Sequence, residues 1–132
     1  MRDLVINYLK SLNLKSFKVS LELPFEPNGT ALHIKNPKSI YVDVEQYEKE
    51  PFIKVMNGKD INIDDTIVNV YFATDAKQLS QEYTNVVSQI RQAVKIDTEH
   101  KYFRETSNIS TEYEKDLLVT IIELRYSMLT TS

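Results

Sequence analysis

The sequence predicts an α+β fold: a single domain with one mostly antiparallel sheet, a short N-terminal helix and one long amphipathic helix packed on one face. Three observations lead to this prediction. The chain has 132 residues, which suits one compact domain. Two segments with helical periodicity alternate with runs that have β periodicity. The chain closes in a long apolar run without Gly or Pro, which is typical of a strand.

The first elements are a helix and a strand. Residues 2–12 repeat apolar side chains at helical spacing, which predicts a short amphipathic helix. Residues 16–23 alternate apolar and polar side chains, which predicts a half-buried strand.

A Pro-rich loop or arm is predicted at 24–38, with a short strand near 31–34. It holds three of the four prolines, and Pro27, Asn28 and Gly29 form a turn signal because they favour the backbone angles of a turn. A connection this long is often functional or disordered.

The middle of the chain predicts a hairpin between two strands. Residues 39–44 predict a strand and residues 45–50 an acidic irregular segment. A β-hairpin is predicted near 52–63, because Asn57 and Gly58 favour a type I′ turn. Residues 66–73 are dense in β-branched side chains, which predicts a central strand.

The last third predicts the long helix and a second hairpin. Residues 76–95 form the helix, with Asp75 as N-cap and Gln78 completing a capping box. A short strand is expected at 101–106, a polar turn at 107–111 and the long closing strand at 113–128.

The closing strand is apolar on both faces along its first half. One face is expected to pack on the long helix, and it carries Leu118, Ile122, Leu124, Tyr126 and Met128. The opposite face carries Leu117, Val119 and Ile121. A strand that is apolar on both sides needs cover on both, and in so small a chain a second protein can supply it. These three residues are therefore the predicted subunit interface.

Composition excludes several classes of site. The chain has no cysteine, so disulfides, thiolate zinc sites and cysteine nucleophiles are absent. Net charge is −3, divided into +3 over residues 1–40 and −6 over the rest, without a dense basic cluster for nucleic acid. The N-terminus is too short and polar for a signal peptide or membrane span. We expect a soluble protein made in a cytoplasm, without a membrane partner.

No catalytic, cofactor or metal site is predicted. His33 and His100 are far apart and have no partner at metal-ligand spacing. Residues 60–64 superficially resemble a calcium loop but lack its Gly and Glu, and their alternation favours an edge strand. With only two glycines there is no phosphate loop.

Three carboxylates spaced two residues apart are the remaining candidate for chemistry. Glu112, Glu114 and Asp116 would share one face of a strand, but nothing in the sequence marks a cleft around them. Pairing with Lys101 or Arg104 across the hairpin is the simpler interpretation.

The eight tyrosines divide into two expected groups. Tyr71, Tyr83 and Tyr126 follow core-facing patterns. The others include candidates for exposed contacts: Tyr41, Tyr47, Tyr102 and Tyr113. Tyr is enriched at protein–protein contacts, and a basic groove for base stacking is missing, so interface use is favoured.

The stretch from residue 66 to 128 resembles the tail-terminator (tail-completion) proteins of long-tailed bacteriophages. The likeness lies in the strand V-N-V-Y-F-A-T-D, the amphipathic helix, the strand K-Y-F-R-E-T and the closing strand L-L-V-T-I-I-E-L-R-Y. It covers about half of the chain and is architectural. The opening helix and the domain size also fit.

The resemblance implies a virion structural protein rather than an enzyme. Such proteins form a ring, typically a hexamer, that caps the finished tail tube, ends its polymerisation and presents a docking face to the head–tail connector, while DNA passes through the lumen. The implied partners are other copies of the chain, the tail tube protein and the connector; the location is the head-proximal end of the tail, reached from the host cytoplasm. Two loops are candidate partner contacts: Pro27, Asn28 and Gly29 in the first, and Asn57 and Gly58 in the second. Another head–tail joining or neck protein, or a small oligomeric α+β binding module, stays an alternative.

Overall fold

A computed structural model describes residues 1–14, 17–24, 38–54, 58–75, 81–114 and 116–131. It confirms the α+β fold, with two α-helices and a six-stranded, mostly antiparallel sheet. The elements in chain order are α1 (Arg2–Ser11), β1 (Lys18–Val19), β2 (Ser39–Val42), β3 (Gln46–Ile53), β4 (Ile61–Asp75), α2 (Gln81–Arg91), the 3₁₀ turn η1 (Gln92–Lys95), β5 (Arg104–Glu114) and β6 (Leu117–Thr131).

Two strands of 15 residues organise the sheet. β4 and β6 pair antiparallel over their whole length, from Ile61 opposite Thr131 to Asp75 opposite Leu117. β5 lies on the other edge of β6, and both β2 and β3 pair with the other edge of β4. β1 adds a short parallel edge to β2. The strand order is therefore β1-β2-β4-β6-β5, with β3 beside β2 along β4.

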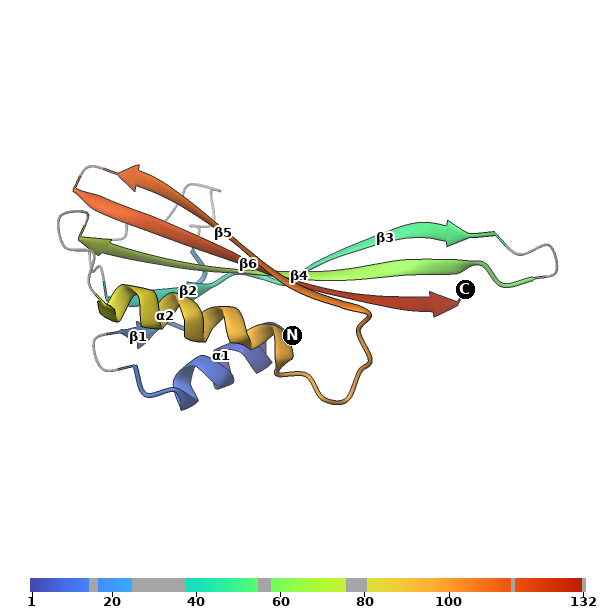
Figure 1. The fold of residues 1–132 in the computed structure, drawn as a ribbon, viewed down its shortest axis with the longest axis horizontal. Helices are drawn as coiled ribbons and strands as arrows, with labels where there is room; N and C mark the ends of the chain where they lie inside the picture. Colours follow the sequence, from blue (N-terminus) through green and yellow to red (C-terminus); the bar gives the residue numbers. More distant parts are fainter. Residues whose placement is uncertain (15–16, 25–37, 55–57, 76–80, 115, 132) are drawn as a thin grey trace.

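The sheet has a covered half and a projecting half. Figure 1 shows both helices beside the end that contains β1, β2 and the β5–β6 turn, whereas β3 and its partners extend beyond them. We define the projecting half as β3 together with residues 61–67 of β4 and 125–131 of β6, which the pairing places opposite β3. The strand order reverses from top to bottom between the two ends of Figure 1, so the sheet twists strongly along its length.

The hydrophobic core lies between the helices and one face of the covered half. Ile122 and Leu124 of β6 are fully buried there, and fully buried Tyr126, at the start of the projecting half, extends this core, as the alternation of the closing strand predicts. Each pairs with a residue of β4 on the same face, and Phe72 of β4 meets Phe17 edge to face at 5.7 Å. From the helices, the buried side chains are Val5, Ile6, Leu9, Val86, Ile90, Ala93 and Val94.

The helices agree with the sequence where the structure describes them. α1 is present, but it buries Val5, Ile6 and Leu9, whereas Leu4 of the predicted apolar stripe (Leu4, Val5, Tyr8 and Leu12) is 47% exposed. The long helix is described from Gln81 and tightens into η1 after Arg91. Asp75 is the last residue of β4, and the predicted capping partner Gln78 lies outside the described residues.

Several strand boundaries differ from the prediction. The segment predicted as irregular at 45–50 belongs to β3, and the predicted turn at 107–111 lies inside β5. Both are edge strands with mostly exposed side chains, so neither needs the apolar alternation by which a strand is recognised. The first predicted strand is shorter, because only Lys18 and Val19 pair with β2.

The closing strand starts later than predicted, at Leu117 instead of Tyr113. β5 runs to Glu114, which pairs directly with Leu117 of β6, so a tight turn interrupts the predicted strand. No Gly or Asn-Gly marks that turn in the sequence. Residues 61–64, expected on an edge strand, belong to central β4 with β3 on one side and β6 on the other.

The hairpin near 52–63 is present as β3 paired with β4. The last described pair joins Ile53 and Ile61, and Gly58 has a positive φ of 133° that favours glycine. Its turn type rests partly on Asn57, which lies outside the described residues, as does the Pro-rich loop over 25–37 with Pro27, Asn28 and Gly29.

Candidate protein-interaction surface

The candidate functional surface is the sheet face opposite the helices, here called the open face. Alternation along β4 and β6 decides which side chains point to it, because residues on the core face occupy the intervening positions. Along β6 the open face carries Leu117, Val119, Ile121, Glu123, Arg125, Ser127, Leu129 and Thr131, and along β4 it carries Ile61, Ile63, Asp65, Ile67, Asn69, Tyr71, Ala73 and Asp75.

The predicted interface residues lie together on the open face of the covered half. Val119 is only 9% exposed and its cross-strand neighbour Ala73 is fully buried, so this pair is covered within the chain itself. Leu117 and Ile121 are half-buried and remain accessible. Tyr71, predicted to face the core, instead lies opposite Ile121 on this face, because β4 alternates from buried Phe72.

A polar network occupies the middle of the open face. Ser127 is fully buried and donates its hydroxyl hydrogen bond to Asp65, which is 6% exposed. The Arg125 guanidinium donates to the other Asp65 oxygen at 2.9 Å, and Arg104 donates to the Ser127 hydroxyl oxygen at 3.3 Å. Arg125 also meets the carboxylate of Glu123 at 3.5 Å. Each buried polar atom at the centre of the network therefore has a partner.

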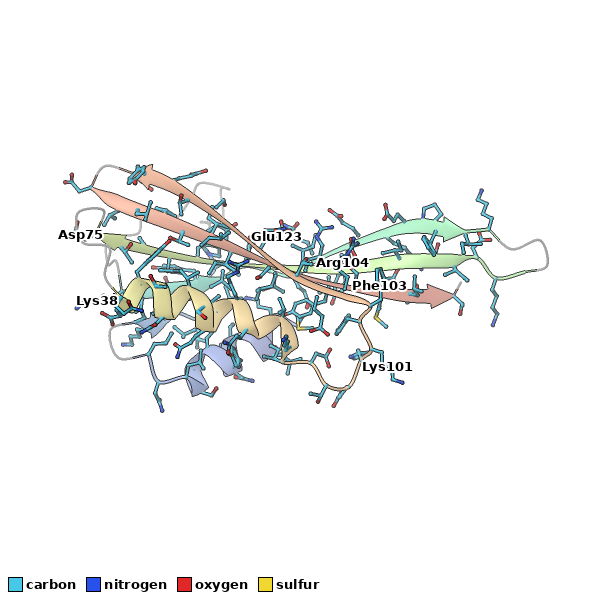
Figure 2. The ribbon with its side chains drawn as sticks, in the orientation of Figure 1. Lys38, Asp75, Lys101, Phe103, Arg104 and Glu123 are labelled. Atoms are coloured by element: carbon cyan, nitrogen blue, oxygen red, sulfur yellow. The ribbon has the colours of Figure 1, made fainter. Side chains whose placement is uncertain are left out.

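This network lies where the covered half meets the projecting half. Figure 2 places Arg104 and Glu123 near the middle of the molecule, where the strands cross in projection. Arg104 belongs to β5, Asp65 to β4, and Arg125 and Ser127 to β6. Three strands are thus tied by charged hydrogen bonds at the position where the helices no longer cover the sheet.

The projecting half ends in exposed apolar side chains. Phe52, Ile53 and Leu129 are 56%, 47% and 50% exposed, and the β3–β4 pairing shifts register between Pro51 and Ile53. All eight residues of β3 are exposed. A three-stranded sheet with such exposed apolar residues is a candidate partner contact.

The three candidate carboxylates lie at one end of the β5–β6 hairpin. Glu112 and Glu114 lie at the end of β5, Asp116 lies in the turn, and all are exposed. Arg104 lies at the opposite end of β5, so the predicted pairing of these carboxylates with Lys101 or Arg104 is wrong. The physical reason is that Arg104, Glu112 and Glu114 belong to one continuous strand, so they are not cross-strand neighbours.

Sequence reasoning missed a second polar cluster, after η1. The Asp97 carboxylate accepts hydrogen bonds from the Tyr102 hydroxyl at 2.6 Å and, at 3.0 Å each, from His100 Nδ1 and the Glu99 backbone. The hydrogen bond from Tyr102 is the main cause that lowers the pKa of Asp97 to about 2, and burial raises the pKa of Tyr102.

The Asp97 cluster closes one end of the core. The ring of Tyr102 packs on Tyr126 with centroids 5.4 Å apart, and the Tyr126 hydroxyl donates to the Ala93 carbonyl at 2.8 Å. His100 therefore has a local structural partner, whereas His33 lies outside the described residues. The only sequence signal was the close spacing of Asp97, His100 and Tyr102.

Within the described ranges, no three His, Asp or Glu side chains come close enough to hold a metal ion. No helix in that part of the chain is long and apolar enough to cross a membrane. The chain matches no protein-family model and no curated protein.

Proposed function

We propose that this chain is a phage virion structural protein that closes into a ring on the end of the tail tube, ends tail polymerisation and provides the docking interface for the head. The observation that carries the proposal is the projecting half of the sheet, which extends beyond the helices with exposed Phe52, Ile53 and Leu129. Surfaces of this kind are characteristic of subunits that complete their packing on assembly.

The geometry also favours a head-to-tail contact over a two-fold one. A ring subunit needs two different patches, one for each neighbour. The open face of the covered half and the end of the projecting half are different patches, and the twist of the sheet turns them in different directions. A hexamer of 15.4 kDa subunits would have a mass of about 92 kDa.

Such a protein acts through surface complementarity and carries out no reaction. The tail tube protein, the head–tail connector and further copies of the chain are its proposed partners, and DNA passes through the lumen without sequence-specific contacts. The mixed charges of Asp65, Glu123 and Arg125 on the open face fit a protein contact better than a DNA-binding groove.

The test is the position of the protein on purified tails. A tagged chain is expected at the head-proximal end of each tail in immunogold micrographs, and its loss is expected to give tails of abnormal length that do not join heads. Label along the whole tail, at the distal end or absent from the virion would refute the proposal.

A dimeric protein-binding module is the second candidate. Half-buried Leu117 and Ile121 favour it, because two open faces could pack against each other. Light scattering distinguishes the dimeric module from the ring-forming protein. A dimer that persists at all concentrations and never adds further subunits favours the module.

A further inference from the structure

We propose that the tip of the projecting half binds the β5–β6 hairpin end of a second copy of this chain, head to tail. The tip is defined as residues 52–54 and 58–60 with Leu129, and the hairpin end as residues 112–114, 116 and 117. The inference rests on the proposed ring-forming function and assigns the two surfaces that each subunit uses.

The two surfaces lie at opposite ends of the same pair of strands. The β4–β6 ladder runs from Ile61 and Thr131 near the tip to Asp75 and Leu117 beside the hairpin end. Fifteen residues at about 3.3 Å each separate them by roughly 50 Å. Figure 1 shows them at the two extremes of the molecule, so a tip cannot reach the hairpin end of its own chain.

Both surfaces expose large apolar side chains. At the tip these are Phe52, Ile53 and Leu129, each about half exposed. At the hairpin end half-buried Leu117 lies beside Glu114 on the open face, whereas Tyr113, 74% exposed, pairs with Leu118 and lies on the other face of the sheet. Aromatic and aliphatic groups of this size supply the central contacts of protein interfaces.

The charges of the two surfaces are complementary. The tip carries exposed Lys54 and Lys59 with one aspartate, Asp60, which gives +1. The hairpin end carries three exposed carboxylates, those of Glu112, Glu114 and Asp116, which give −3. Lys38 and Asp75 also lie at the hairpin end of the sheet, as Figure 2 shows, and their opposite signs leave the balance unchanged.

The opposite charges of the two surfaces favour binding of a tip to a hairpin end. A tip facing a second tip, or a hairpin end facing a second hairpin end, brings like charges together, which disfavours a two-fold contact through either surface. A tip facing a hairpin end brings opposite charges together around the apolar residues. The contact is therefore heterologous, and repetition closes a ring or continues a filament.

The absence of cysteine from the sequence makes a cross-linking test specific. Lys59→Cys and Glu114→Cys introduce the only thiols, one on each surface. Mixing the two single variants under mild oxidation is expected to give mixed dimers, identified by a mass tag on one variant. A chain carrying both substitutions is expected to give a ladder of higher oligomers.

The matched control replaces Glu114→Cys with Lys10→Cys, an exposed position on α1. Circular dichroism verifies that every variant is folded. The proposal is overturned if Lys59→Cys cross-links to Glu114→Cys no more than to Lys10→Cys. That result would leave the proposed function open to its own test on tails, because a ring can close through other surfaces.

Reversing the charges of the two surfaces tests the contact between tip and hairpin end with the thiols placed at other positions. Thr131→Cys beside the tip and Ser110→Cys beside the hairpin end, both exposed on the open face, serve as reporters. Lys54→Glu with Lys59→Glu is expected to lower their cross-linking several-fold. Glu112→Lys with Glu114→Lys on the other partner is expected to restore it. Loss without restoration would show that the charges do not face one another and would contradict the proposal.

Discussion

The two halves of the sheet share the same pair of long strands, yet different forces hold them. In the covered half, Phe72, Ile122 and Leu124 are fully buried beneath the helices, and hydrophobic burial dominates. In the projecting half every residue of β3 is exposed, and the strands depend on backbone pairing and on the Asp65 network. The covered half contains the fold's own core, and the projecting half presents surface to a partner.

The largest expected effect comes from a charge in the core of the covered half. Ile122→Asp places an unpaired carboxylate at a fully buried position and is expected to cost about 4 kcal/mol or more, enough to unfold a domain of this size. Urea denaturation followed by circular dichroism measures it.

The matched control is the preceding residue of β6, Ile121, whose side chain lies on the opposite face of the sheet. Ile121 is half-buried on the open face. Ile121→Asp is therefore expected to lower the free energy of unfolding by less than about 1.5 kcal/mol while weakening association between subunits. Equal destabilisation by the two variants would show that this chain covers both faces of β6, which would remove Ile121 as an interface candidate.

A smaller effect is expected where the halves meet. Asp65→Asn removes the charge that Arg125 and Ser127 share and is expected to cost about 2 to 3 kcal/mol. Hydrogen exchange is expected to rise more in β3 than in α1. The control is Glu50→Gln, at an exposed position of β3. An equal rise of hydrogen exchange in that variant would show that the Asp65 network does not hold β3 in place.

The pH dependence of the covered half gives a third test. The Asp97 pKa is about 2, below its ordinary value near 4, so its charged form stabilises the fold above pH ~4 and this contribution is lost as pH falls through 2. Asp97→Asn is expected to cost about 1 to 2 kcal/mol at neutral pH. The difference in unfolding free energy between wild type and variant should shrink between pH 4 and pH 2; a constant difference would contradict the assignment.

The smallest effect on stability is expected at the tip. Leu129 is half exposed, so Leu129→Ser is expected to lower the free energy of unfolding by less than about 1 kcal/mol. Leu124 on the same strand is fully buried, so Leu124→Ser should lower it by about 3 kcal/mol. Thermal unfolding of both variants measures this contrast. Comparable losses would show that the projecting half has a core of its own.

Sequence reasoning succeeded where a strand has one buried face. The alternation of Leu118, Ile122 and Leu124 identified the core face of β6, because burial selects apolar residues at every second position. It failed for β3 and β5, whose exposed faces carry no such selection. The turn before Leu117 has no glycine to mark it, which displaced the start of β6.

The candidate surface divides in the same way. By itself the sequence determined the two helices, the central strand and the assignment of Leu117, Val119 and Ile121 to the face away from the core. Only the tertiary structure decided that Val119 is covered, that Asp65 meets Ser127 across 62 positions of sequence, and that half of the sheet projects beyond the helices. The physical reason is that periodicity is a local consequence of burial, whereas register, twist and cross-strand charge pairs depend on which distant segments come together.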